Sequence, residues 1–168
     1  MCRYKPDLYN QMIEVRNGED VKRDSSRFMK IVMENLPLPI GLQLRLVKEH
    51  EPMDTKRLKN LLSTYIITAQ TLYYILLSNL WEEVGRKKCA VAPDFLEKIK
   101  LTLENEHKFD FMAALLDVHK FMIINDLSFF APELDIFCQN LNNPSQDLHN
   151  AHNFLKNLCA PFRKTRTI

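Results

Sequence analysis

The sequence predicts an all-α protein, an irregular helical bundle built around two long antiparallel helices at residues 54–84 and 108–125. Its apolar residues recur three and four positions apart, which is the spacing of a helix face turned toward a core. Only three of the 168 residues are glycine, which argues against hairpin-rich β folds and glycine-rich phosphate loops. The hydrophobic fraction of 46% and the charged fraction of 26% are ordinary for a globular protein. We therefore expect residues 1–168 to form a single helical domain.

Prolines and capping residues place the first elements. A short helix is expected at residues 7–15, where the polar sequence RNGED ends it. A helix at 27–36 stops at LPLP, because proline cannot continue a helix and restricts the residue before it. Pro39 suits the first turn of the next helix, which is expected at 40–50. Asp54 is a suitable N-cap for the long helix that follows.

The helix at 54–84 is expected to lie at the centre of the bundle. Its apolar positions follow the helical spacing, and Ile67, Tyr74 and Ile75 widen the apolar stripe beyond one packing seam. An apolar surface larger than one seam requires often marks an interface. This helix is therefore the strongest sequence-level candidate for contact with a partner.

One segment of this helix also has the length of a membrane span. Residues 61–81 carry no charge and are long enough to cross a bilayer. However, Gln70 and Asn79 interrupt the segment, and a carboxamide in lipid is costly unless a partner satisfies it. We therefore expect a buried helix and no membrane span.

The rest of the chain predicts further helices with polar connections. Asp94 is expected to cap the first of them, and Pro161 to end the last. The expected elements are helices at 95–105 and 108–125, a short helix near Pro132, a last helix at 146–159, and a basic tail at 161–168.

The cysteines and the N-terminus indicate an intracellular protein. The four cysteines are scattered, with no C-x-x-C pair, so we interpret them as free thiols. The N-terminal sequence MCRYKPDLYN lacks the apolar run of a signal peptide. We therefore expect a cytoplasmic protein, and the formal net charge of +2 gives no global attraction to nucleic acid or membrane.

Few residues form a pattern that carries chemistry. The chain has no nucleophile elbow, phosphate loop or dinucleotide fingerprint, so we expect no cofactor. His149 and His152 lie three positions apart, hence on one helix face, and Cys138 or Cys159 could approach them. Zinc requires three or four converging ligands, and a loose pair does not predict a metal site. His119, on the second long helix, is interpreted as a half-buried structural histidine.

Two basic clusters could contact phosphate groups. Their alternative interpretation is a solvated loop and a solvated tail, which we favour because neither cluster is interleaved with aromatic residues. The phosphate-binding candidates are Arg86, Lys87, Lys88, Arg163, Lys164 and Arg166.

The order of four features resembles a known family. LPLPIGLQLRLV leads into the long apolar helix, and FDFMAALLDVHKFM, FFAPELDIF and a closing helix with an asparagine-centred polar patch follow. This order is similar to that of helical domains in bacterial proteins related to the HEPN superfamily. The resemblance covers residues 35–158 and is one of pattern rather than identity.

The resemblance implies a damaged ribonuclease motif. Active members carry an Arg, a polar residue such as Asn, and a His four to six residues after the Arg, and a homodimer brings these groups together to cleave RNA. Asn153 matches the Asn, but His152 stands where the Arg would be and Asn157 where the His would be. Imidazole binds phosphate less well than guanidinium, and a carboxamide cannot act as a base. The resemblance therefore implies that the nuclease activity is lost.

Three functional hypotheses follow. The favoured one is a non-catalytic helical module that binds a protein partner or forms a homodimer. The second is a metal-independent RNA endonuclease, in which His149 or His152 is the base and Lys156, on the same helix face as His149, is the cation. The third is a protein that binds nucleic acid, RNA included, through its basic clusters.

Overall fold

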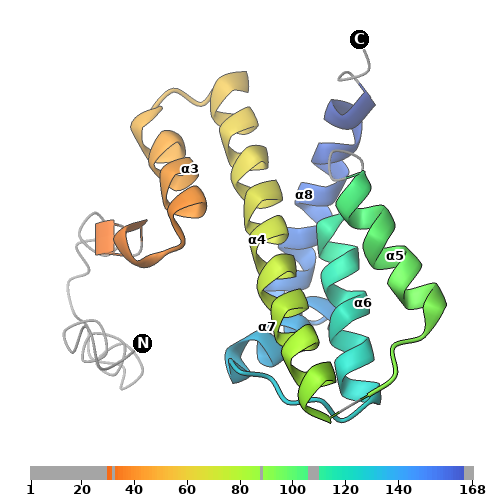
Figure 1. The fold of residues 1–168 in the computed structure, drawn as a ribbon. Helices are drawn as coiled ribbons and strands as arrows, with labels where there is room; N and C mark the ends of the chain where they lie inside the picture. Colours follow the sequence, from red (N-terminus) through yellow and green to blue (C-terminus); the bar gives the residue numbers. More distant parts are fainter. Residues whose placement is uncertain (1–29, 32, 88, 106–109, 165–168) are drawn as a thin grey trace. The chain divides into compact units, whose positions relative to one another are not determined.

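The computed structural model describes residues 30–31, 33–87, 89–105 and 110–164, with side chains described as far as Cys159 (Figure 1). The predicted all-α class is confirmed, because the described residues form helices and connections and contain no strand. The predicted helix at 7–15 and residues 27–29 and 32 of the predicted helix at 27–36 lie outside the described residues. The named helices are α3 (Leu38–Glu49), α4 (Thr55–Lys87), α5 (Pro93–Glu104), α6 (Phe111–Ile124), α7 (Pro132–Asn142) and α8 (Asp147–Lys164).

The chain divides into two compact units, residues 1–60 and 61–168. Within the first unit, α3 begins with proline in its first turn, as the sequence predicts. Gly41 is buried there, and a Cβ atom at this position would lie 2.5 Å from the backbone oxygen of Met33. Only glycine permits this close approach of two backbone segments. The Asp54 carboxylate accepts a hydrogen bond from the backbone N–H of Arg57 at 2.9 Å, which confirms Asp54 as a cap of α4.

The core of the second unit is built on the apolar face of α4. This face packs against α5, α6 and the segment that leads to α7, with Leu76 and Leu80 fully buried. The regular spacing of large apolar residues produces one continuous stripe, which is why the sequence predicts this helix well. The central members of the core are Tyr73, Leu76, Leu80, Phe111, Leu115, Val118, Met122 and Leu141.

The two long helices α4 and α6 run parallel, so the predicted antiparallel arrangement is wrong (Figure 1). Tyr73 contacts Phe111 at the start of α6, with 5.7 Å between ring centroids. Further along both helices, Lys87 donates a hydrogen bond to the backbone oxygen of Asp126. The reason is the intervening α5, which returns the chain to the end where α6 begins. Helical periodicity predicts a buried face but gives no information about chain direction.

Two helix ends also differ from those predicted. The helix expected to start behind an Asp94 cap begins at Pro93, and Asp94 lies inside its first turn. A carboxylate in the first turn still interacts favourably with the helix dipole. The last helix passes Pro161 and continues to Lys164, so its predicted end was wrong. Proline so close to a helix end removes one backbone hydrogen bond and leaves the earlier turns intact.

A buried polar network joins α4 to the segment between α6 and α7. Asn79 is 4% exposed, and its side chain donates to the backbone oxygen of Ser128 and accepts from the backbone N–H of Phe130, both at 3.2 Å. One turn later, the carboxylate of Glu83 accepts from the backbone N–H of Ser128 at 3.2 Å. Arg86 neutralises Glu83 at 2.6 Å. The side chains of Asn79 and Glu83 thus satisfy backbone groups of this connecting segment that have no partner within a helix or a sheet.

The same segment ends α6 through a left-handed turn at Asp126, whose φ is 50°. The backbone N–H of Leu127 donates to the backbone oxygen of Met122 at 2.9 Å. The backbone N–H of Asp126 donates to the backbone oxygen of Ile123 at 3.2 Å. This pair of bonds is a Schellman motif, in which glycine is the usual residue at the left-handed position. Aspartate tolerates this conformation better than most residues do.

Among the described helices, only α4 is long and apolar enough to cross a membrane by length and composition. One third of its most apolar window is buried inside the structure, and its core positions pack on other helices. The expected absence of a membrane span stays a prediction.

We predict that Asn79→Ala lowers the free energy of unfolding by about 2–3 kcal/mol, because two buried backbone groups lose their partner. Ser78→Ala is the matched control, since the neighbouring Ser78 is exposed and bonds only within its own helix. Its effect should stay within about 0.5 kcal/mol. Urea denaturation of the three proteins measures both differences, and equal effects of the two variants would contradict a bridging role for Asn79.

Candidate functional site

The sequence-predicted site residues of α8 lie beside α4 and the start of α6. The hydroxyl of Tyr65, on α4, forms a 2.8 Å hydrogen bond with Nδ1 of His152, and the two rings are tilted with centroids 6.1 Å apart. Amphipathic spacing produces this placement, because Leu148 and Cys159 turn the same side of α8 toward the core. His152 is consequently half-buried, with Nδ1 engaged and Nε2 as the ring nitrogen that remains for a further contact.

His149 is fixed by hydrogen bonds at both ring nitrogens. Its Nδ1 lies 2.8 Å from the backbone oxygen of Leu141, which can only accept, so Nδ1 must carry a proton. In the neutral ring Nε2 is then an acceptor, and the Asn153 side chain donates to it at 2.8 Å. His149 thus ties α8 to the end of α7. As a catalytic base it would first have to release Asn153.

Lys156 forms an ion pair with Asp110 at 3.0 Å. Asp110 is the N-cap of α6, and its carboxylate accepts from the backbone N–H of Ala113 at 3.3 Å. The pair therefore links α8 to the first turn of α6. The positive charge that the nuclease hypothesis assigns to a phosphate is already opposed by a carboxylate.

The electrostatic surroundings favour a neutral His152. Burial lowers the pKa of His152, the positive charge of Lys156 lowers it further, and His149 acts in the same direction. The carboxylate of Asp110 opposes these effects by raising the pKa. A neutral imidazole is the form that a base requires, so this observation favours catalysis more than any other in the site.

The remaining motif position, Asn157, is exposed on the outer side of α8. Asn153 is also exposed, although it holds His149. The structure therefore brings four of the candidate residues into one polar group: His149, His152, Asn153 and Lys156. The sequence analysis missed two members of this group, Tyr65 and Asp110. The sequence offers one signal for each: Tyr65 is a polar side chain within the apolar stripe of α4, and Asp110 stands at the capping position before α6.

The first basic cluster is engaged in local contacts. Arg86 bridges Glu82 at 2.7 Å and Glu83 at 2.6 Å, so two carboxylates oppose its charge. Lys87 donates to the backbone oxygen of Asp126. Lys88, Arg166 and the side chains of Arg163 and Lys164 lie outside the described part of the structure. For Arg86, the contacts fit the interpretation of a solvated structural residue better than that of a phosphate ligand.

Two further groups bear on metal and acid–base chemistry. Within the described residues, no three His, Cys, Asp or Glu side chains converge on a point that could hold a metal ion. Cys138 is fully buried, and burial raises the pKa of its thiol to about 12. A thiol with this pKa stays protonated at neutral pH and is a poor nucleophile.

His119 has a partner that the sequence did not indicate. Its Nε2 lies 2.8 Å from the carboxylate of Asp135 on α7, and the side chain of Gln139 donates to the same oxygen at 3.0 Å. The hydrogen bond with His119, followed by that with Gln139, lowers the pKa of Asp135 against the effect of burial. His119 is 7% exposed, and its ring is tilted against that of Phe129 with 5.4 Å between centroids. The bond between His119 and Asp135 therefore holds α6 and α7 together.

Comparison with known proteins adds no assignment. No family model matches this chain, and no curated protein or solved structure matches it. The resemblance to the HEPN superfamily therefore stays a hypothesis based on the order of sequence features.

We predict that an NMR titration of the imidazole gives His152 a pKa below its ordinary value of 6.5. In that case the unfolded state binds more protons than the folded state between the two pKa values, so folding stability decreases as the pH falls through this window. His152→Gln removes this proton uptake and should weaken the pH dependence of stability between about pH 7.5 and about pH 5.5. A pKa at or above 6.5 would overturn the prediction.

Proposed function

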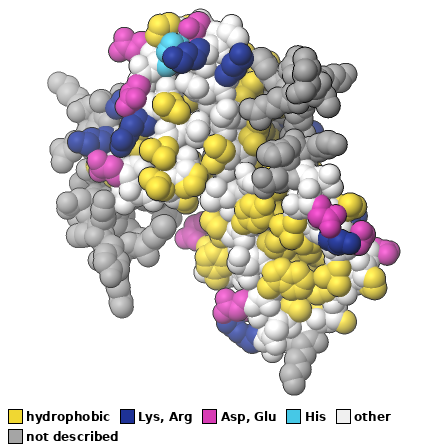
Figure 2. Space-filling model, turned by 45° about the horizontal axis from the view of Figure 1, so that its top comes forward, with side chains coloured by type: hydrophobic (Ala, Val, Ile, Leu, Met, Phe, Trp, Pro, Cys, Tyr) yellow, Lys and Arg dark blue, Asp and Glu magenta, His cyan; other side chains and the backbone are white. Residues whose placement is uncertain are grey.

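We propose that this chain is a non-catalytic all-helical interaction module that binds a protein partner or a second copy of itself. The observation that carries the proposal is the number of large hydrophobic side chains at the surface. Figure 2 shows hydrophobic side chains gathered on the visible face of residues 61–168, with charged side chains at the edge of this area. Exposed large hydrophobic side chains of this unit include Trp81, Ile123, Ile124, Phe130, Ile136 and Phe154.

Trp81 is the clearest single candidate for a binding contact. It lies on α4, the helix whose apolar stripe exceeds one packing seam, and it is 42% exposed. Tryptophan is enriched among the residues that contribute most to the affinity of protein interfaces. A half-exposed tryptophan on a rigid core helix needs little reorganisation to bind a partner, which favours affinity.

The contacts within the α8 polar group also support a non-catalytic role. Both ring nitrogens of His149 are bonded, and Lys156 is paired with Asp110. A catalytic base and cation would need to exchange these partners for a substrate, at the cost of the contacts that hold α8 to α6 and α7. These side chains therefore account for the attachment of α8 without requiring a reaction.

The ribonuclease hypothesis retains one specific observation in its favour. His152 is shifted toward the neutral form and lies near the cation of Lys156, as a base and a phosphate ligand would. RNA supplies its own 2′-hydroxyl nucleophile, so such a site would need no metal. The ribonuclease hypothesis predicts that the protein cleaves RNA, whereas the interaction module predicts that RNA stays intact.

We predict that the purified protein leaves mixed-sequence RNA intact in metal-free buffer, and that His152→Ala behaves identically. The physical reason is that the Asn157 carboxamide cannot act as a base and that the Lys156 cation is paired with Asp110. Gel electrophoresis of labelled RNA measures the outcome. Cleavage by the natural sequence that disappears in His152→Ala would replace the proposed function with a ribonuclease.

We predict concentration-dependent dimerisation in sedimentation velocity across the micromolar range, and that Trp81→Lys weakens it about tenfold, or about 1.4 kcal/mol. Ser78→Lys is the matched control, since it adds the same charge at an exposed position of α4 without removing apolar surface. Equal weakening by the two variants would show that charge, and not the Trp81 contact, is responsible. A chain that stays monomeric throughout would exclude self-association and leave a different protein as the partner.

A further inference from the structure

The last turns of α4 carry four exposed residues on one side of the helix: Trp81, Glu82, Gly85 and Arg86. Trp81 and Gly85 lie four positions apart, so one follows the other along the same face. Glu82 and Arg86 have the same relation on the flank of this face. The buried residues of these turns, such as Leu80, lie on the other side of the helix. We call the four exposed residues the outer face of α4.

Gly85 is a glycine that the fold of the chain does not require. It lies inside α4 with ordinary helical backbone, so its conformation does not demand glycine. Among the described residues, no atom from outside the local helix lies within 4 Å of the place where a Cβ atom would stand. Glycine inside a helix lowers its stability relative to alanine. Close approach by a second molecule would account for the missing side chain.

Trp81 has the shape that fills this space in a second copy of the chain. If two copies of α4 pack antiparallel, with the two-fold axis midway between Trp81 and Gly85, each Trp81 lies level with Gly85 of the other copy. Large and small residues then alternate across the contact, which lets the two surfaces interdigitate. A parallel pair would place Trp81 against Trp81 and leave the space at Gly85 empty. The outer face is therefore complementary to itself in the antiparallel direction.

The charges on the flank are self-complementary in the same arrangement. Glu82 and Arg86 form an ion pair within the helix at 2.7 Å, and their side chains are 64% and 63% exposed. Such an exposed pair contributes little to stability, so its members can exchange partners. In the antiparallel pair this flank faces its own copy, with Glu82 about 3 Å along the helix axis from the level of the other Arg86. Arg86 can keep its separate bond to the buried Glu83 meanwhile.

We propose that the outer face of α4 binds the same face of a second copy of this chain as an antiparallel pair, with the Trp81 ring of each copy over Gly85 of the other. The proposal rests on the proposed function in its self-associating form and names the surface that carries it. Ser78 lies level with a position beyond Lys87, where α4 of the other copy has ended, so Ser78 stays outside the contact.

The fluorescence of the full-length protein reports this contact directly, because Trp81 is the only tryptophan of the chain. Its emission should move to shorter wavelength as the protein concentration rises, since pairing removes the ring from water. The midpoint of this shift should agree with the dimerisation measured by sedimentation velocity.

Gly85→Ala should act in opposite directions on folding and on pairing. It should raise the melting temperature of the dilute protein by about 1–4 °C, because alanine favours the helix and its Cβ atom has room. It should also weaken pairing about fivefold or more, because the same atom occupies the place of the Trp81 ring.

A pair of complementary variants tests which residues face each other. Trp81→Ala and Gly85→Leu should each pair at least about tenfold more weakly than the natural sequence, because one loses the large side chain and the other fills the space. A mixture of the two should pair about threefold or more tightly than either alone, since Trp81 then meets Gly85 once and Ala meets Leu once. Only the Gly85→Leu copy carries tryptophan, so its emission reports the mixed pair. If Trp81→Ala fails to fold, Gly85→Ala decides alone.

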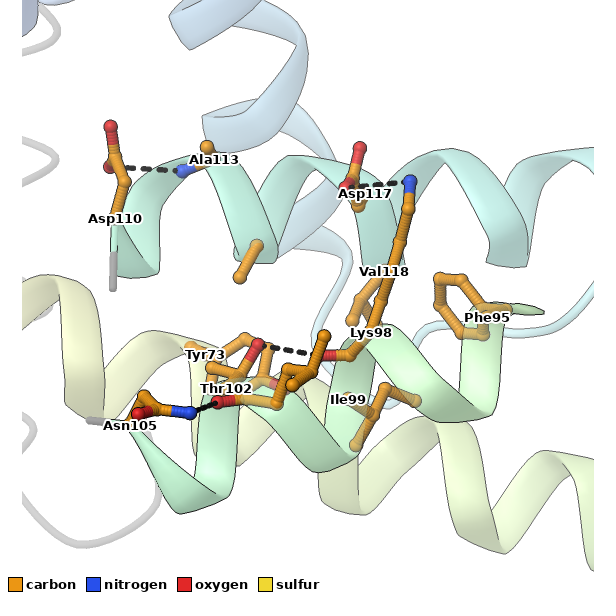
Figure 3. Close-up of a pocket in the computed structure, with 12 residues that line it drawn as sticks. Tyr73, Phe95, Lys98, Ile99, Thr102, Asn105, Asp110, Ala113, Asp117 and Val118 are labelled. Carbon is orange, nitrogen blue, oxygen red and sulfur yellow. Dashed lines mark hydrogen bonds and ion pairs between the residues drawn. The ribbon is translucent and has the colours of Figure 1, made fainter. Parts of the chain in front are cut away.

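Glu82→Arg tests the flank, and it should weaken pairing about fivefold by bringing like charges together. Asp117→Arg is the matched control, because Asp117 is also exposed and also paired, with Lys98 at 3.6 Å. Figure 3 shows this pair reaching from α5 to α6 beside a cavity of about 510 Å³, whose lining includes no residue of the outer face of α4. The control should leave pairing within about twofold of the natural sequence.

Three results would overturn the proposal. Dimerisation that is unchanged in Gly85→Ala and Gly85→Leu would place the self-association on another surface and leave the proposed function intact. A mixture of Trp81→Ala and Gly85→Leu that pairs no better than its components would exclude the contact between these two positions. A chain that stays monomeric, with constant Trp81 emission across the micromolar range, would exclude both this pairing and self-association.

Discussion

The attachment of α4 to the segment after α6 is the constraint on which the second unit depends. Asn79 and Glu83 place buried polar groups on an otherwise apolar face, and such groups are costly without partners. The backbone of Ser128 and Phe130 supplies those partners. Because the bonds are directional, they fix where the chain leaves α6 and turns into α7. Apolar packing alone would hold the helices together without fixing this path.

The position of α7 in turn determines the surroundings of α8. His119 and Asp135 hold α7 against α6, and the backbone oxygen of Leu141, at the end of α7, orients His149. Lys156 completes the attachment of α8 through the cap of α6 at Asp110. The polar group of α8 is therefore the last link in a series of contacts that begins on α4, and each link joins residues far apart in the sequence.

Local patterns explain which features could be predicted from the sequence. Period-three-and-four spacing identified the long helix α4, and the carboxylate of Asp54 identified its start. The direction of α6 relative to α4 could not be predicted, since it depends on how α5 packs. Asn79 was interpreted only as an obstacle to membrane insertion, because its partner lies 49 positions further along the chain. The spacing of side chains within one helix does not indicate partners that lie so far along the chain.

Asp110 joins the polar group of α8 to the cavity between α5 and α6. Its carboxylate caps α6, pairs with Lys156 of α8, and belongs to the lining of the cavity between α5 and α6. A change at Asp110 would therefore disturb the helix cap, the α8 polar group and the cavity together, and its effect could not be assigned to one of them. Tyr73 and His152 lack this overlap: Tyr73 lines the cavity, whereas His152 bonds Tyr65 outside it. Substitutions at these two residues consequently separate an effect on the cavity from an effect on α8, even though the Asp110 side chain is shared by both.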